Sequence, residues 1–222
     1  MKRLFFSLIM LGAIFVACAT GQEQYSFALV KGDAVEQIFP LYRYLYLVEY
    51  QEYPYLYKGN AQEVEEYITF LKDQPDTVVA IVYYNDEPVG FACATSFLNF
   101  DKHFEGSAQV FKDAGLQPED YFYGADVFIQ KEHQGNFLSK KLLQALEEHA
   151  QQSGYNKICF IYESYDEHPS KPSDFVDPEP VYQRLGYIKT DLATKFTWNT
   201  ILPDGTTNDR EHVLTYWVKN IE

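Results

Sequence analysis

The chain has 222 residues, in which acidic residues outnumber basic ones by 32 to 18, so the formal net charge is −14. Such a charge repels nucleic acid and attracts cationic partners, although it also serves solubility alone. The length suits one domain with a substantial core. The sequence contains neither an internal repeat nor a low-complexity linker.

Residues 1–20 are typical of a secretory signal. Lys2 and Arg3 precede an apolar run over residues 4–17, and small residues follow around Cys18. The run is shorter than the roughly 20 residues of a membrane-spanning helix. Residues 15–18 resemble a lipobox, with phenylalanine in place of the usual first leucine; ordinary cleavage at an A-x-A pattern is the alternative.

Removal of the signal leaves residues 21–222, with 16 basic and 32 acidic residues and a net charge of −16. We expect an exported or membrane-associated protein, with a lipid anchor at Cys18 if the lipobox is used. An uncleaved anchor that holds the domain at the cytoplasmic face of the membrane is the alternative.

Cys93 and Cys159 lie in apolar, strand-like runs, which favours buried free thiols over a disulfide. No C-x-x-C spacing occurs in the sequence. We predict no metal site, because ligand-like spacing is also missing among the histidines considered, namely His103, His133, His149 and His212.

The first half of the chain predicts a strand followed by two helices. The strand covers residues 25–32. Asp33 is expected to cap a helix that Pro40 kinks or restarts and that continues to about residue 52. A second helix, over residues 61–72, has Val64, Ile68 and Leu71 on one face.

Residues 77–97 are typical of a β-hairpin, with a turn-forming cluster at residues 85–88. A strand follows at residues 121–129, and then a long helix at 137–153 that Gly154 ends.

The remaining residues predict a strand at 157–163, a short helix at 179–185 stopped by Gly186, and an antiparallel pair at 194–201 and 212–220. One central βαβ crossover among hairpins indicates an α/β (α+β) fold around one sheet.

This order of elements resembles the GNAT superfamily of acyl-CoA-dependent N-acyltransferases over about residues 26–221. Two markers carry the resemblance: the turn EHQGNFLSKKLLQAL at residues 132–146, and EPVYQRLGY at 179–187, which is similar to A-x-x-x-Y-x-x-x-G-[FY]. Residues 52–59, residues 166–172 and the late FTW and TYW segments look like one uncharacterised branch. The resemblance implies a mostly antiparallel sheet flanked by helices, with a splayed central strand pair.

The turn after residue 129 has an apolar strand before it and only one glycine, so it is either an anion site or an ordinary strand-to-helix corner. In the family this turn reads [RQ]-x-x-G-x-[GA], and its backbone N–H groups hold the pyrophosphate of acetyl-CoA at a helix N-terminus. Phe137 replaces the central glycine and Ser139 the last small residue. Lys140 and Lys141 either add positive charge or form a solvated helix face. The cofactor-binding residues that the resemblance implies are Gln134, Gly135, Asn136, Phe137, Leu138 and Ser139.

The family also implies roles on the strand before the turn and on the short late helix. The backbone groups of Val127 and Ile129 would bind pantetheine and polarise the acyl carbonyl. Tyr182 matches a tyrosine near the sulfur, where it would protonate the leaving thiolate. A packed aromatic is the alternative for Tyr182.

Asp126 is the one charge in its apolar strand, and burial would raise its pKa as a general base requires. A structural hydrogen bond to a neighbouring loop is the alternative. Glu163, Asp166 and His168 are secondary candidates, and in many family members an ordered water relays the proton.

Residues 42–57 contain seven tyrosines interleaved with Glu49 and Glu52. In the family this region forms one wall of the acceptor site, so an aromatic, acidic wall would suit a cationic amine. Rings that merely cover the sheet are the alternative.

Two functions remain open. One is an acyl-CoA-dependent N-acetyltransferase that acts on a small primary amine or a protein amino terminus by direct attack on the thioester. The other is a non-catalytic GNAT-like binding domain with a weakened CoA site, exported or lipid-anchored. Phe137 and the signal support the second, since export separates the protein from cytosolic acetyl-CoA. The fold, Tyr182 and most of the turn favour the enzyme.

Overall fold

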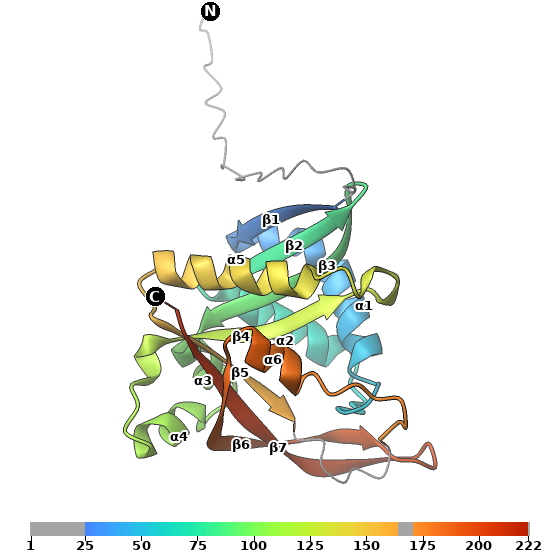
Figure 1. The fold of residues 1–222 in the computed structure, drawn as a ribbon. Coiled ribbons are helices and arrows are strands. Elements are labelled where there is room, and N and C mark those ends of the chain that lie inside the picture. Colours follow the sequence, from blue (N-terminus) through green and yellow to red (C-terminus); the bar gives the residue numbers. More distant parts are fainter. Residues whose placement is uncertain (1–24, 164–170, 222) are drawn as a thin grey trace, which may run out of the picture.

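The structure, a computed structural model, describes residues 25–163 and 171–221. The predictions for residues 1–20, including the anchor at Cys18, lie outside the described residues, as do Asp166 and His168. In the described part, seven strands form one sheet in the order β1-β2-β3-β4-β5-β7-β6. Helices cover both faces of this sheet (Figure 1).

The strands are β1 Tyr25–Lys31, β2 Val78–Tyr84, β3 Glu87–Ser96, β4 Tyr121–Ile129, β5 Lys157–Glu163, β6 Ile188–Ile201 and β7 Thr207–Asn220. The α-helices are α1 Phe39–Glu49, α2 Ala61–Asp73, α3 Phe97–His103, α4 Ser107–Asp113, α5 Leu138–Gln152 and α6 Glu179–Arg184. Short 3₁₀ helices lie at η1 Gly32–Ile38, η2 Pro118–Asp120 and η3 Lys131–His133.

Strand β2 is apolar along its whole length, and Val78–Val82 are all buried, because helices cover both faces of the sheet. Along β2, Val78 and Ala80 pack with α5 on one face, whereas Val79 and Ile81 pack with α1 and α2 on the other. The second face continues under α3 and α4 with a separate aromatic cluster. The predicted α/β sheet flanked by helices is therefore confirmed.

Helix α5 packs on the sheet through residues four apart, Leu138, Leu142 and Leu146, as the helical period requires. Helix α2 begins at Asn60, whose Oδ1 accepts from the backbone N–H groups of the second and third helical residues at 3.0 Å each. Both helices were predicted to within one residue at each end.

Some local predictions are wrong or incomplete. Asp33 caps no helix: the chain enters a 3₁₀ helix at Gly32 without a side-chain cap. Pro40 is one of the first residues of α1, so a new helix begins there after the 3₁₀ helix. Phe97 begins α3 instead of ending the hairpin, because the Ser96 side chain accepts from the Asn99 N–H at 3.2 Å and caps a helix there. The helices α3 and α4 were not predicted.

The predicted hairpin turn and the predicted ends of α5 and α6 are confirmed. Asn85 and Asp86 both have positive φ, 50° and 67°, as a two-residue hairpin turn requires. Gly154 and Gly186 follow α5 and α6 with φ of 89° and 90°, the left-handed conformation that ends a helix. Cys93 and Cys159 are buried free thiols, as predicted.

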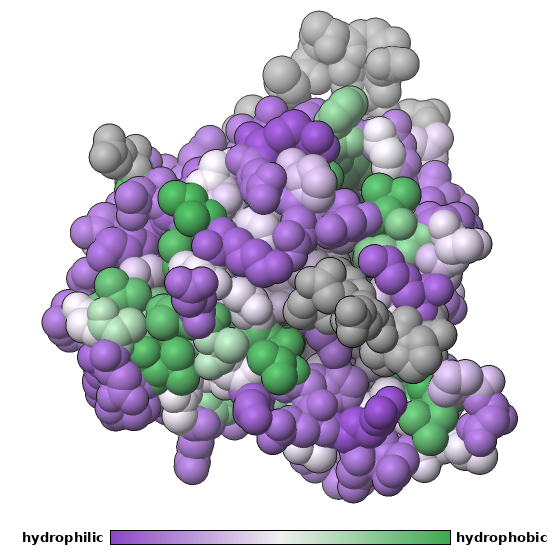
Figure 2. All heavy atoms as spheres, turned by 60° about the horizontal axis from the view of Figure 1, so that its bottom comes forward, coloured by the Kyte–Doolittle hydropathy of each residue, from purple (hydrophilic) through white to green (hydrophobic). Residues whose placement is uncertain are grey.

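The face of the molecule shown in Figure 2 is mostly polar. Figure 2 shows hydrophobic residues in small groups among hydrophilic ones on the face that it presents. In residues 25–163 and 171–221, every helix is too short or too polar to cross a membrane.

Candidate functional site

The central feature of the sheet is an opening between the parallel strands β4 and β5. They pair only at their first residues, Tyr121 with Lys157 through Tyr123 with Cys159, and their ladder ends there. On its other side, β4 stays paired with β3 as far as Ile129, with a bulge opposite Cys93 and Ala94. The splayed central pair that the sequence predicted is therefore present.

The register of β3 and β4 fixes which backbone groups of β4 face the opening. The Gln130 N–H donates to the Val89 carbonyl at 2.9 Å, so residue 130 points toward β3. Backbone groups alternate sides along a strand, and the β3–β4 register is continuous between Asp126 and Ile129. The backbone groups of Val127 and Ile129 therefore point toward the opening; their predicted role in binding pantetheine stays a prediction.

The turn after β4 leads to the N-terminus of α5. The Gln134 side chain donates to the Ile129 carbonyl at 3.0 Å and ties the turn to the strand. The Asn136 amide donates to the carbonyls of His133 and Gln134, so it does not cap the helix. Phe137 is the N-cap residue and makes no side-chain cap bond either.

The first N–H groups of α5 therefore lack both intrahelical and side-chain partners among the described residues, which is the arrangement that binds an anion. A Cβ added at Gly135 would meet nothing within 4 Å, so the turn also has room beside its backbone. These features fit the pyrophosphate group of acetyl-CoA. The roles of Leu138 and Ser139 would come from their backbone N–H groups.

Phe137 departs from the family pattern in the structure as it does in the sequence. Its φ is 58°, in the left-handed region that glycine adopts freely, and its side chain is 77 % exposed. The backbone of the turn thus keeps a glycine-like conformation although the residue is phenylalanine. Lys140 is exposed, and Lys141 places its Nζ over the Phe27 ring at 5.3 Å.

Asp126, on β4, is 5 % exposed and accepts three tyrosine hydroxyl groups. Tyr50 donates to Oδ1 at 2.6 Å, Tyr67 donates to Oδ2 at 3.1 Å, and Tyr42 also donates to Oδ2. Burial raises the pKa of Asp126, and the three phenols lower it in part. Both oxygens of this carboxylate are thus occupied, by residues of α1, α2 and the segment after α1.

The predicted tyrosine wall therefore has its acidic group in Asp126. Tyr42 and Tyr50 point into the wall, whereas Tyr44 is exposed on the outer side of α1. Glu49, which the sequence placed in the wall, is partly buried, and its pKa is raised by burial and by Glu52, with Lys131 lowering it in part. Because β4 and α1 are far apart in sequence, the sequence alone could not join Asp126 to the wall.

The segment after α1 crosses to the far edge of the sheet. Lys58 N–H donates to the Asn199 carbonyl and Ile201 N–H donates to the Leu56 carbonyl, both at 2.7 Å, so the segment is fastened to β6. Trp198 Nε1 donates to the Tyr55 carbonyl at 2.9 Å. Burial raises the pKa of Tyr55, and neighbouring Tyr182, Glu163 and Asp126 raise it further, so its phenol lies within electrostatic reach of all three.

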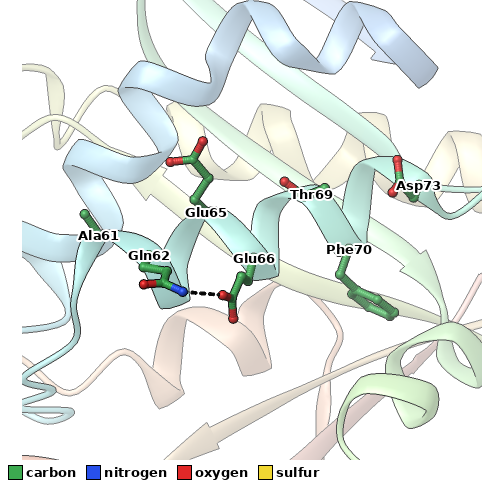
Figure 3. A pocket seen from close by; sticks show the side chains of 7 residues that line it. All are labelled: Ala61, Gln62, Glu65, Glu66, Thr69, Phe70 and Asp73. Carbon is green, nitrogen blue, oxygen red and sulfur yellow. Dashed lines mark hydrogen bonds between the residues drawn. The ribbon is translucent and has the colours of Figure 1, made fainter.

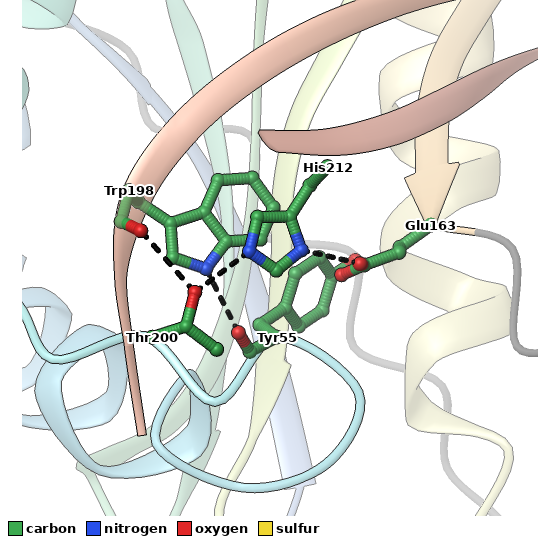
Figure 4. A network of polar contacts seen from close by, with 5 residues as sticks. All are labelled: Tyr55, Glu163, Trp198, Thr200 and His212. Carbon is green, nitrogen blue, oxygen red and sulfur yellow. Dashed lines mark hydrogen bonds and ion pairs between the residues drawn. The ribbon is translucent and has the colours of Figure 1, made fainter. Parts of the chain in front are cut away.

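A second buried carboxylate lies at the end of β5 (Figure 4). Glu163 Oε1 is 2.5 Å from His212 Nδ1, and His212 Nε2 is 2.8 Å from the Thr200 hydroxyl. The His212 ring stacks on Trp198 with centroids 3.5 Å apart. The sequence named Glu163 only as a secondary candidate and gave His212 no role.

Tyr182, on α6, lies on the opposite face of the sheet from Asp126. Its ring packs against Phe160, Tyr162 and Trp217 with centroid distances of 4.8, 5.3 and 5.6 Å. Burial, and then the charge of Asp177, raise its pKa, so the phenol keeps its proton at neutral pH. Its hydroxyl has no hydrogen-bond partner in the described part of the chain.

Two other features lie apart from this opening. Figure 3 shows a hollow along the outer side of α2, whose lining residues all belong to that helix: Ala61, Gln62, Glu65, Glu66, Thr69, Phe70 and Asp73. Across residues 25–163 and 171–221, no group of three or more histidine, cysteine or carboxylate side chains could hold a metal ion.

A sheet that opens between two parallel central strands, with an uncapped helix N-terminus beyond the longer one, defines the acetyltransferase type of α/β fold. The family model described as "Acetyltransferase (GNAT) family" matches residues 36–187. The chain belongs to this family. A comparison with curated proteins gave no match.

Solved structures of the same fold agree. The N-acetyltransferase from Staphylococcus aureus Mu50 has a TM-score of 0.54 at 13% identity, over 89% of this chain and 99% of that chain. The yncA protein from Salmonella typhimurium, solved with its cofactor acetyl-CoA, has a TM-score of 0.51 at 15% identity, over 90% and 95%. The ribosomal-protein-S18-alanine N-acetyltransferase from Escherichia coli has a TM-score of 0.52 at 9% identity, over 89% and 94%. At these identities the likeness is one of fold.

Proposed function

We propose that the protein is an acetyl-CoA-dependent N-acetyltransferase that acetylates a primary amine. The observation that carries the proposal is the open edge of β4, which presents the backbone of Val127 and ends at the uncapped start of α5. When bound, acetyl-CoA supplies an acetyl group activated as a thioester. Residues 134–139 would hold its pyrophosphate, and the backbone of Val127 and Ile129 would orient its extended arm.

The protein's own residues would supply the remaining chemistry from the two faces of the sheet. The tyrosine wall around Asp126 offers ring faces and a negative charge, which suit an amine that arrives as a cation. Tyr182, on the other face, holds a phenolic proton that it can donate to a leaving thiolate. Direct attack of the neutral amine requires no covalent intermediate on the enzyme.

The experiment is an acetyl-transfer assay with a panel of primary amines: polyamines, aminoglycosides, amino-acid amides and peptides with free amino termini. Thiol release from acetyl-CoA should rise with at least one class, and mass spectrometry should find the matching amide. Tertiary-amine analogues of the best acceptor serve as the control. Thiol release that no primary amine accelerates would contradict an N-acetyltransferase.

We further propose, on the basis of residues 1–20, that the domain is membrane-associated. An uncleaved anchor would keep the domain at the cytoplasmic face with acetyl-CoA, whereas the domain is exported and anchored through Cys18 if the lipobox is used. Cys18→Ser should then move the protein from the membrane fraction to the soluble fraction. A soluble cytosolic protein with an intact Met1 in mass spectrometry would contradict this localisation.

A further inference from the structure

Glu163 combines deep burial with incomplete hydrogen bonding. The residue is 7 % exposed, and Oε2 is buried without a hydrogen-bond partner in the described part of the chain. A buried polar atom without a partner loses its hydration and gains no hydrogen bond in return, so such atoms are rare and each requires an explanation. An ionised carboxylate with one empty oxygen is suited to receive an N–H group.

His212 holds the other oxygen in place. An ionised carboxylate can only accept, so the contact of 2.5 Å between Oε1 and Nδ1 requires a hydrogen on Nδ1. The Thr200 hydroxyl at Nε2 and the stacked Trp198 ring fix the imidazole in its plane. In Figure 4 the carboxylate of Glu163 and the ring of His212 point toward each other, beside the Tyr55 side chain.

The register of the parallel pair brings Glu163 to the opening. Tyr121 pairs with Lys157, and both strands run on in the same direction for six residues, to Val127 and Glu163 respectively. The bulge in β4 adds one residue, so the end of β5 lies beside Val127 and Phe128. The end of β5 that carries Glu163 therefore lies across the opening from the backbone of Val127.

Asp126, the candidate base chosen from the sequence, differs in this respect. Its two oxygens accept three phenolic hydroxyl groups, so an amine would have to displace one of them. An amine could bind Glu163 Oε2 without displacing another hydrogen-bond donor. The titratable groups that act on or are affected by Glu163 are His212 on β7 and Tyr55 in the segment after α1.

We propose that Glu163, held and tuned by His212, is the base that accepts the proton of the acceptor amine. The N–H bond of the ammonium breaks, an O–H bond forms at Oε2, and the electron pair stays on nitrogen for attack on the thioester carbonyl. His212 is a positioning residue in this scheme. The assignment rests on the proposed function and names the base within the same site.

The acidity of the pair agrees with this role. Burial raises the pKa of Glu163, while the hydrogen bond and charge of His212 lower it in part. A raised pKa gives the carboxylate more affinity for a proton than an exposed glutamate has, as a base for an amine requires.

The first test compares three carboxylate variants with the most active amine of the panel. Glu163→Gln should lower kcat/KM by about 10²–10⁴-fold and leave the Kd of acetyl-CoA unchanged, as expected for a lost general base. Glu147→Gln is the matched control: this partly buried carboxylate on α5 is bonded to Tyr187 and Lys219, away from the opening, and its loss should leave turnover intact. Normal turnover by Glu163→Gln together with inactivity of Asp126→Asn would overturn the proposal.

The second test separates positioning from simple structure. Because His212 lowers the pKa of Glu163, His212→Gln should raise it and move the acidic limb of the kcat/KM profile to higher pH. A purely structural histidine would change the melting temperature without moving that limb, and that result would contradict the role of His212.

The third test does not depend on turnover. The side-chain carboxyl carbon of Glu163, assigned by its loss in Glu163→Gln, is titrated by NMR in the full chain without acetyl-CoA. Its pKa should lie above that of an ordinary glutamate and rise further in His212→Gln. If the pKa of Glu163 is that of an ordinary glutamate and does not change in His212→Gln, this proposal is wrong, even if the protein is an active acetyltransferase. If the protein does not bind acetyl-CoA, the proposed function itself is wrong.

Discussion

Tyr182 and Tyr187 lie five residues apart around α6, and their hydroxyl groups have different surroundings. Tyr187 donates to Glu147 Oε1 at 2.9 Å in the core, whereas the Tyr182 hydroxyl has no partner among the described residues. The sequence identified Tyr182 through the EPVYQRLGY pattern alone. It could not identify the Glu163–His212 pair, because 49 residues separate the two and only the β5–β7 register joins them.

At Tyr182 we predict an effect on turnover. Tyr182→Phe keeps the ring contacts with Phe160 and Trp217 but removes the proton donor, so kcat should fall by about 10²–10⁴-fold with an unchanged Kd for acetyl-CoA. The control is Tyr187→Phe, which should cost about 1 kcal/mol of unfolding free energy and leave kcat alone. Normal turnover with earlier melting in Tyr182→Phe would show that its hydroxyl is structural.

At the scale of elements, long periodic segments were predictable and short ones were not. The continuous apolar run of β2 and the four-residue spacing in α5 can be read directly from the sequence. The helices α3 and α4 have seven residues each and depend on tertiary contacts, such as Phe100 stacked on Tyr123 at 3.7 Å. Such short aromatic runs carry no clear period.

The start of α5 gives the prediction at this scale. Phe137 has φ of 58°, a conformation that costs a non-glycine residue roughly 1–2 kcal/mol. Phe137→Gly removes this strain, but glycine also adds backbone entropy to the unfolded chain, which offsets part of the gain. The free energy of unfolding in urea should therefore rise by about 1 kcal/mol. The affinity for acetyl-CoA should rise or stay the same.

Phe137→Ala is the matched variant, since it removes the ring and keeps the strained φ. It should not gain the stability that glycine gains. A marked loss of acetyl-CoA affinity in Phe137→Gly, with the fold intact, would show that the phenyl ring contributes to binding.

The whole molecule is unusually rich in buried tyrosines, among them Tyr42, Tyr50 and Tyr67 around Asp126, whose pKa values burial raises well above 10.0. The sequence showed the number of tyrosines, but only the folded chain shows that so many phenols share one carboxylate. The sign of the pH effect follows. Above about pH 10 the unfolded chain releases phenolic protons that the folded chain retains, so unfolding becomes more favourable as pH rises.

We therefore predict alkaline destabilisation. The free energy of unfolding should be flat near pH 8 and should fall above pH 10 by about 1.4 kcal/mol per pH unit for each such tyrosine. The free energy of unfolding is measured by urea titrations at pH 8, 10 and 11, with tryptophan fluorescence as the signal. An unchanged free energy at pH 11 would mean that these phenols ionise freely in the folded protein.

The central claim is that the open edge of β4 and the uncapped start of α5 form an acetyl-CoA site. Calorimetric titration of the chain with acetyl-CoA tests it most directly, with acetylpantetheine, which lacks the pyrophosphate, as the comparison ligand. We predict saturable binding of one acetyl-CoA per chain and clearly weaker binding of acetylpantetheine, because only acetyl-CoA reaches the amides of the helix N-terminus. No binding of acetyl-CoA at millimolar concentration would contradict the claim and favour a GNAT-like domain without catalysis.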